Sequence, residues 1–206
     1  MKKQLFPLFA SIVLMMACNN AANKQEAENK TEEEKTESSD ASTSGGGILS
    51  AANETEKRVE ELKKLPPVSN ETLKSYFPEE VMGMKRSSFN VSSAMGYAAG
   101  TAEYRKNDTT EYSVAIYDCA GEAGAGFYSM SWLAGMNMES ENDNGYQKTV
   151  SFMGNKAIEG YSKSNHEHTL SFLSGERFWV TIEGNEGLDN LKAFADRLGL
   201  GKLKAN

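Results

Sequence analysis

The spacing of hydrophobic and polar residues changes near residue 87, and this change separates two kinds of predicted structure. After it, short runs alternate apolar and polar positions, which is typical of half-buried β-strands. We predict strands at residues 89–91, 98–104, 112–116, 150–152, 170–172 and 178–182. Short turns separate the later runs, so we expect antiparallel pairing, because a parallel return needs a long crossover.

Four other segments have helical spacing. We predict helices within 48–65, over 69–76, over 127–136 and over 188–198. Ser69 is a suitable N-cap for the second helix, and Gly199 suits a left-handed cap after the last one. Together the elements predict a single α+β domain over 48–206, an antiparallel sheet with helices packed on one face.

The N-terminus has the pattern of an export signal. A basic start, Met1-Lys2-Lys3, precedes an apolar run over 5–16. That run is shorter than the roughly 20 apolar residues needed to cross a bilayer. We therefore predict a signal peptide over 1–17.

The Ala17-Cys18 junction after this run resembles the lipobox of bacterial lipoproteins. The resemblance implies that the Cys18 thiol takes a diacylglyceryl group, that the signal is cut before it and that the new amino terminus is acylated, palmitate being a typical acyl chain. Several acyl chains on one residue give a stable membrane anchor. Asn19, in place of the aspartate that retains many such proteins in the inner membrane, favours the outer membrane.

The segment from residue 18 to residue 47 is predicted to be a disordered acidic tether. Its residues 19–47 hold seven acidic side chains and three lysines, with no aromatic residue and no aliphatic larger than alanine. Such a composition cannot bury enough apolar surface to offset the entropy of ordering. The segment is similar to the tethers of Bacteroidota-type lipoproteins, and a metal-binding or partner-binding tail is the alternative interpretation.

The charge and cysteine content restrict the functions of the remaining residues. Residues 48–206 contain 17 basic and 22 acidic side chains without a basic stripe, which argues against nucleic-acid binding. Once Cys18 is lipidated, Cys119 is the only other thiol, so no intramolecular disulfide can form. Asp118 beside it would raise a thiol pKa, so Cys119 is not a predicted nucleophile.

Two short motifs could hold a ligand or a metal. Gly121–Gly126 follows a strand and opens a helix, but it lacks the spacing and the lysine of a phosphate-binding loop. His166 and His168 share one face if they lie on a strand, but zinc needs three or four ligands. We expect a tight turn at the first motif and a partly exposed pair at the second, with no metal site.

The segment over 127–138 is the main candidate for ligand binding. Its apolar side chains surround the predicted helix instead of lining one stripe, so it is either a core helix or one with an exposed apolar side. Methionine and aromatic side chains suit adaptable binding surfaces. The candidate groove residues are Phe127, Met130, Trp132 and Met136.

These observations predict a lipid-anchored protein of the cell envelope. The prediction depends on the N-terminal anchor sequence and not on a catalytic motif. The folded part, over about 70–203, resembles uncharacterised bacterial envelope proteins. We expect a non-catalytic binding or structural module without a cofactor, whose partner is an envelope protein or a hydrophobic ligand. The alternatives are a carrier of a small hydrophobic ligand and a metal-dependent envelope enzyme that uses His166, His168 or Asp118.

Overall fold

The structure is a computed structural model that describes residues 44–93 and 96–205, without the side chains of 44–52, 132 and 133. The predicted signal peptide, Cys18 and nearly all of the predicted tether lie outside these residues. The first described element is α1 (Ser44–Lys63). Residues 44–47, which the composition assigned to the tether, form the first turn of this helix.

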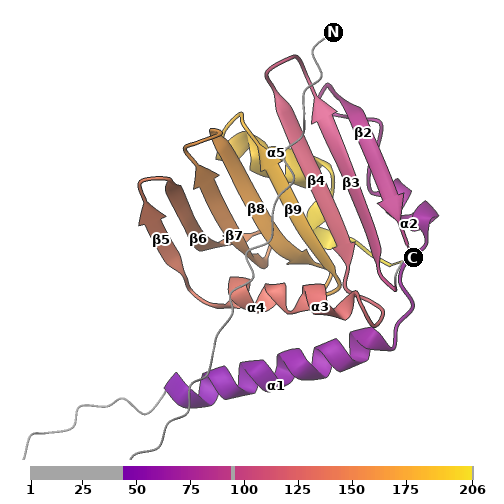
Figure 1. Ribbon diagram of the computed structural model, residues 1–206, viewed down its shortest axis with the longest axis vertical. Coiled ribbons are helices and arrows are strands. Elements are labelled where there is room, and N and C mark those ends of the chain that lie inside the picture. Colours follow the sequence, from indigo (N-terminus) through magenta and orange to yellow (C-terminus); the bar gives the residue numbers. More distant parts are fainter. Residues whose placement is uncertain (1–43, 94–95, 206) are drawn as a thin grey trace, which may run out of the picture. The chain divides into compact units, whose positions relative to one another are not determined.

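Nine antiparallel strands form one sheet in the order β1-β2-β3-β4-β9-β8-β7-β6-β5 (Figure 1). The strands are β1 (Glu80–Val81), β2 (Met84–Ser92), β3 (Ala98–Arg105), β4 (Glu111–Asp118), β5 (Glu139–Asn142), β6 (Gly145–Phe152), β7 (Asn155–Ser162), β8 (Glu167–Ser174) and β9 (Phe178–Gly184). Each of the six predicted runs lies in one of them. The α+β class and the antiparallel pairing are confirmed.

Strand β7 was not predicted because a charge occupies one of its inward positions. Glu159 is only 2% exposed, although its neighbours in the strand are Ile158 and Gly160. Its carboxylate accepts hydrogen bonds from Lys192 at 2.9 Å and from Tyr146 at 3.1 Å, and Lys148 lies 3.4 Å away. Burial raises the pKa of Glu159, but these donors outweigh it and lower the pKa below its ordinary value.

The first face of the sheet packs against α2 (Asn70–Ser75), α5 (Leu188–Arg197) and the short 3-10 helix η1 (Leu200–Lys202). As predicted, the Ser69 hydroxyl caps α2 by accepting from the Thr72 N–H, and Gly199 is left-handed after α5. Inward residues of the central strands form the core. These are Tyr104, Tyr112, Val114, Ile116, Leu170, Phe172, Phe178, Val180 and Ile182.

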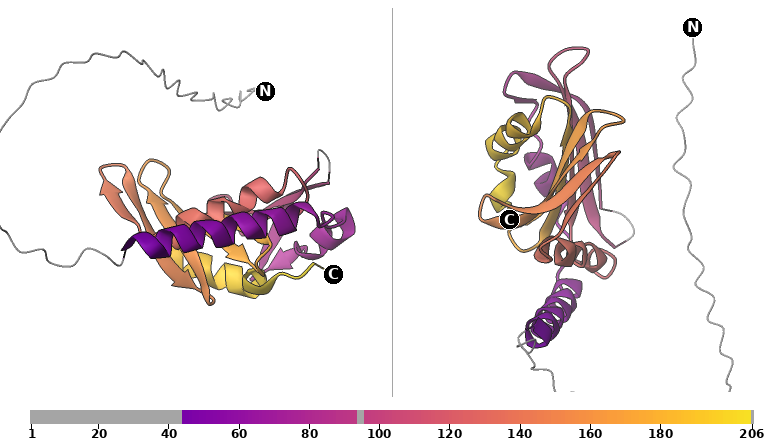
Figure 2. Two further views of the ribbon diagram at one scale, coloured as in Figure 1. Left: turned by 90° about the horizontal axis from the view of Figure 1, so that it is seen from below. Right: turned by 90° about the vertical axis from the view of Figure 1, so that its left-hand side faces the viewer.

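Helices also pack on the second face, so the expectation of helices on one face is wrong. The predicted helix over 127–136 is two short helices, α3 (Ala125–Tyr128) and α4 (Met130–Gly135). With the end of α1 they cover Cys119, Ile158 and Trp179 near one end of the sheet. Figure 2 shows α5 on one side of the sheet and α3 and α4 on the other. Within the described part of the chain, the rest of the second face carries no helix (Figure 1).

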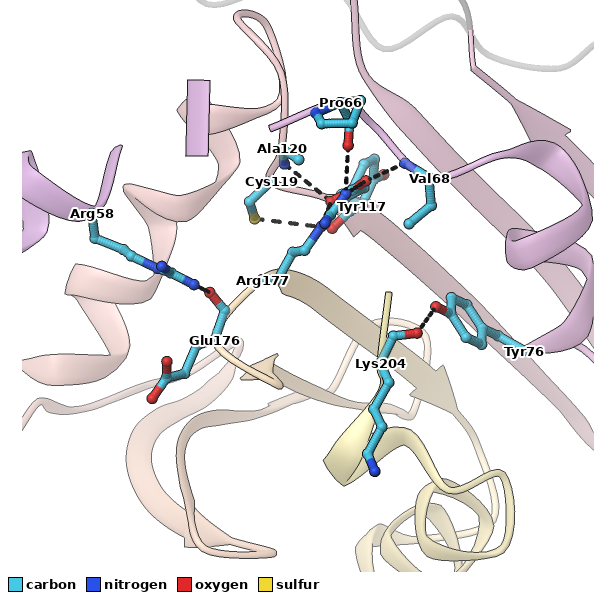
Figure 3. Close-up of polar contacts among 11 residues, drawn as sticks. Arg58, Pro66, Val68, Tyr76, Tyr117, Cys119, Ala120, Glu176, Arg177 and Lys204 are labelled. Carbon is cyan, nitrogen blue, oxygen red and sulfur yellow. Dashed lines mark hydrogen bonds and ion pairs between the residues drawn. The ribbon is translucent and has the colours of Figure 1, made fainter. Parts of the chain in front are cut away.

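A buried ion pair joins the chain segments at this end of the sheet. Asp118 is fully buried and faces the Arg177 guanidinium, with Oδ1 2.7 Å from Nε and Oδ2 2.8 Å from Nη2. The same carboxylate accepts from the backbone N–H groups of Val68 and Ala120. Arg177 also donates to the Pro66 carbonyl (Figure 3). The pair thus fastens the α1–α2 linker to the ends of β4 and β9.

Replacing Asp118 by asparagine tests this contribution. The change keeps the shape of the side chain but removes the charge that compensates Arg177, so we expect the free energy of unfolding to fall by roughly 3–5 kcal/mol. Urea denaturation measures it. Glu111→Gln, which breaks the exposed pair of Glu111 with Arg105 at 3.0 Å, is the matched control and should leave the midpoint nearly unchanged. Equal, small effects of both changes would contradict a structural role for the buried pair.

Candidate functional site

A groove lies on the second face of the sheet, beside the helices α3 and α4. Its cavity has a volume of about 330 Å³. The lining comes from two central strands, β4 and β9, and from the two short helices. The lining residues are Ser113, Ala115, Tyr117, Phe127, Met130, Trp179, Thr181 and Glu183.

The floor of the groove consists of three consecutive cross-strand pairs. In the register of β4 and β9, Tyr117 lies opposite Trp179, Ala115 opposite Thr181 and Ser113 opposite Glu183. These positions alternate with buried residues of the first face, because successive side chains of a strand point to opposite faces. Ser113, Ala115 and Thr181 have small side chains, and this leaves the space of the groove.

Aromatic side chains form one end of the groove. The Phe127 ring stacks on Tyr117 with the ring centroids 4.7 Å apart, and Tyr97 lies 5.5 Å from it. Trp179 is buried beneath them, whereas Met130 at the rim is 43% exposed. This end therefore offers an apolar surface that protein atoms only partly cover.

The glycine-rich turn before α3 places Phe127 over the sheet. A Cβ on Gly124 would lie 2.1 Å from the Ala120 carbonyl oxygen, and one on Gly121, where φ is +87°, would lie 2.5 Å from the Gly96 carbonyl oxygen. Only glycine fits at either position. The glycines are therefore needed for the close backbone contacts of a tight turn, which is the structure predicted for this motif.

The other end of the groove is acidic. Glu183 is the one charged residue in the lining, and among the described residues its carboxylate has no hydrogen bond or ion pair. Two further carboxylates, Glu167 and Glu111, lie close enough to interact with one another. Burial raises the pKa of Glu167, and the charges of Glu183 and Glu111 raise it further.

The structure brings only part of the predicted ligand site together. Phe127 and Met130 line the groove. Met136 does not; it is 37% exposed beyond α4, where its carbonyl accepts from the Thr149 hydroxyl. The side chain of Trp132 lies outside what the structure describes.

Three important groove residues were missed from the sequence. Tyr117, Trp179 and Glu183 occupy the phase of their strands opposite to the predicted core positions, on the second face of the sheet. The available signal was the presence of two large aromatics in that phase. An aromatic at an exposed strand position indicates either a second packed layer or a binding surface.

The histidine pair does not form the strand arrangement that was considered. His166 lies in the β7–β8 turn with φ of 56°, and its Nδ1 is 3.2 Å from the Tyr161 hydroxyl. His168 is on β8 with its ring 4.6 Å from that of Tyr161, and burial lowers its pKa. Within residues 44–93 and 96–205 no group of three or more His, Cys, Asp or Glu side chains could hold a metal ion.

The other candidate reactive groups are occupied or inaccessible. Cys119 is buried, and burial raises the pKa of its thiol to about 12, so the thiolate is scarce at neutral pH. The Asp118 carboxylate is fully used in the network with Arg177. Neither group is therefore free to act as a nucleophile or a base.

Comparison with models of protein families, with curated proteins and with solved structures found no match to this chain. In the described part of the chain, no helix has both the length and the apolar character needed to cross a membrane.

Proposed function

We propose that this is a lipid-anchored cell-envelope protein whose folded domain is a non-catalytic binding module, and that the groove on the second face is its binding site. The observation that carries the proposal is the groove itself. Its volume of about 330 Å³ lies within the range of small-molecule sites, roughly 300–1,000 Å³. Its lining also follows the usual pattern of such sites, with apolar and aromatic side chains and a few polar groups.

The open apolar surface favours binding over a purely structural role. A structural second layer would fill the space above Ala115 and Thr181, since protein interiors are close-packed. Instead Phe127 and Met130 border a cavity, and Met130 remains 43% exposed.

A small molecule suits the groove better than an extended peptide. Strand β4 pairs with β3 and β9 along its length, and β9 pairs with β4 and β8. Their backbone groups are used within the sheet, so a peptide could not add as a further strand there. A ligand would contact side chains only, and a carrier of a small hydrophobic molecule would use the same surface.

The lipid anchor rests on the sequence of the N-terminus. The proposed attachment site is Cys18, after the signal over 1–17, and the outer membrane is the proposed location. Several acyl chains on one cysteine would hold the protein stably, and the tether would leave the domain free to meet ligands in the envelope.

The anchor is tested by changing its cysteine. Cys18→Ser should move the protein from the membrane fraction to the soluble fraction, because no thiol remains for the lipid. Cys119→Ser is the control, because Cys119 is buried, and it should stay with the membrane. Mass spectrometry of the N-terminal peptide should show a lipid on Cys18, and an unmodified Cys18 in membrane-bound protein would contradict the anchor.

The binding site is tested by filling the groove from its floor. Ala115→Phe places a ring in a cavity of about 330 Å³, so Nile red should bind at least about tenfold more weakly, as expected when a large side chain occupies a ligand pocket. Fluorescence titration of the full chain carrying Cys18→Ser avoids competition from the lipid.

Asn90→Phe is the matched control for this experiment. Asn90 is exposed on β2, on the same face of the sheet but outside the groove, and the variant should bind as the parent does. Both variants keep the same N-terminal residues, so a difference between them reports on the groove. Equal binding by Ala115→Phe and its parent would contradict the proposed site.

A further inference from the structure

We infer that the groove takes an amphiphile with a cationic amine at its polar end, held at Glu183, and an apolar portion held between Phe127, Tyr117 and Met130. This inference rests on the proposed binding function and adds the chemical class of the ligand. It depends on three features: the separation of the two ends, the unpaired carboxylate and the charges around it.

The two ends of the groove are separated by a distance that suits a single amphiphile. Glu183 and Trp179 lie on the same face of β9, four residues apart, with Thr181 between them. At about 3.3 Å of rise per residue, this separation is roughly 13 Å. An alkyl chain of medium length can therefore contact the aromatic end while its head group reaches the carboxylate.

Glu183 provides a half-buried negative charge without a partner. It is partly exposed, and no basic side chain of the described residues forms an ion pair with it. A ligand ammonium would donate charge-assisted hydrogen bonds to it, which are among the stronger polar contacts.

The surrounding charges favour a cation over an anion. Glu167 on β8 and Glu111 on β4 interact electrostatically with each other, and Glu183 adds to the same field. Arg105 on β3 is already engaged with Glu111 at 3.0 Å and Glu103 at 3.7 Å. The helices at the other end of the groove contribute Phe127 and Met130 and no charged lining residue. A fatty acid would thus place its carboxylate against like charges.

Matched ligands that differ only in their head groups test this inference. Each of decylamine, decanol and decanoate is titrated at neutral pH against Nile red bound to the full chain carrying Cys18→Ser, and the displacement of the dye is measured. We expect decylamine to bind about tenfold more tightly than decanoate, the difference expected for a charge-assisted contact at a partly buried site. Glu183→Gln should remove most of this preference while decanol binding stays the same.

Glu103→Gln is the control variant, because Glu103 on β3 lies on the same face of the sheet as Glu183 but does not line the groove. It should keep the preference for the amine. If all three ligands bind equally well, or if Glu183→Gln keeps the preference, the inference about the amine is overturned while the binding function stands. If none of the three ligands binds, the proposed function fails with it.

Discussion

The carboxylate of Asp118, buried at the end of β4, accepts hydrogen bonds from Arg177 and from two backbone N–H groups, and much of the surrounding structure depends on these contacts. Arg177 lies just before β9, so the pair fixes the ends of the two central strands against each other. Val68 brings the α1–α2 linker to the same point. A buried ion pair gives little net stability compared with apolar packing in the same place. Losing one partner, however, leaves an uncompensated buried charge, so the pair favours the arrangement of the chain in which both partners meet.

This arrangement also determines where the groove lies. The chain leaves Asp118 through Cys119 and Ala120 into the glycine turn, whose close contacts exclude any side chain at Gly124. The turn leads directly into α3, which places Phe127 on Tyr117. The aromatic end of the groove is thus built at the point where β4, β9 and the linker meet. At the other end, the small side chains of Ala115 and Thr181 and the unpaired Glu183 leave an accessible surface on strands whose opposite face is fully packed.

The sequence predicted the features that depend on local pattern and missed those that depend on pairing across the sheet. Strands with a regular apolar alternation, the Ser69 cap and the Gly199 cap follow from neighbours along the chain, and each was found. Strand β7 was missed because Glu159 occupies an inward position that only Lys192 and Tyr146, distant in sequence, make acceptable.

Only some of the groove residues could be predicted, for the same reason. Phe127 and Met130 belong to an unusually apolar segment that stands out in the sequence. Glu183 and Trp179 gain their role from their register opposite Ser113 and Tyr117, which no local pattern contains. The second helical layer was missed likewise, because the apolar residues that it covers are single positions in different strands.

The central claim is that the groove on the second face binds a small amphiphile. Intermolecular nuclear Overhauser effects between decylamine and the full chain carrying Cys18→Ser locate the ligand directly. The account predicts contacts from the alkyl protons to the rings of Tyr117 and Phe127, and from the protons beside the amine to Thr181 and Glu183. Contacts confined to another hollow, such as the one lined by Arg58, Met153 and Lys204, would contradict it.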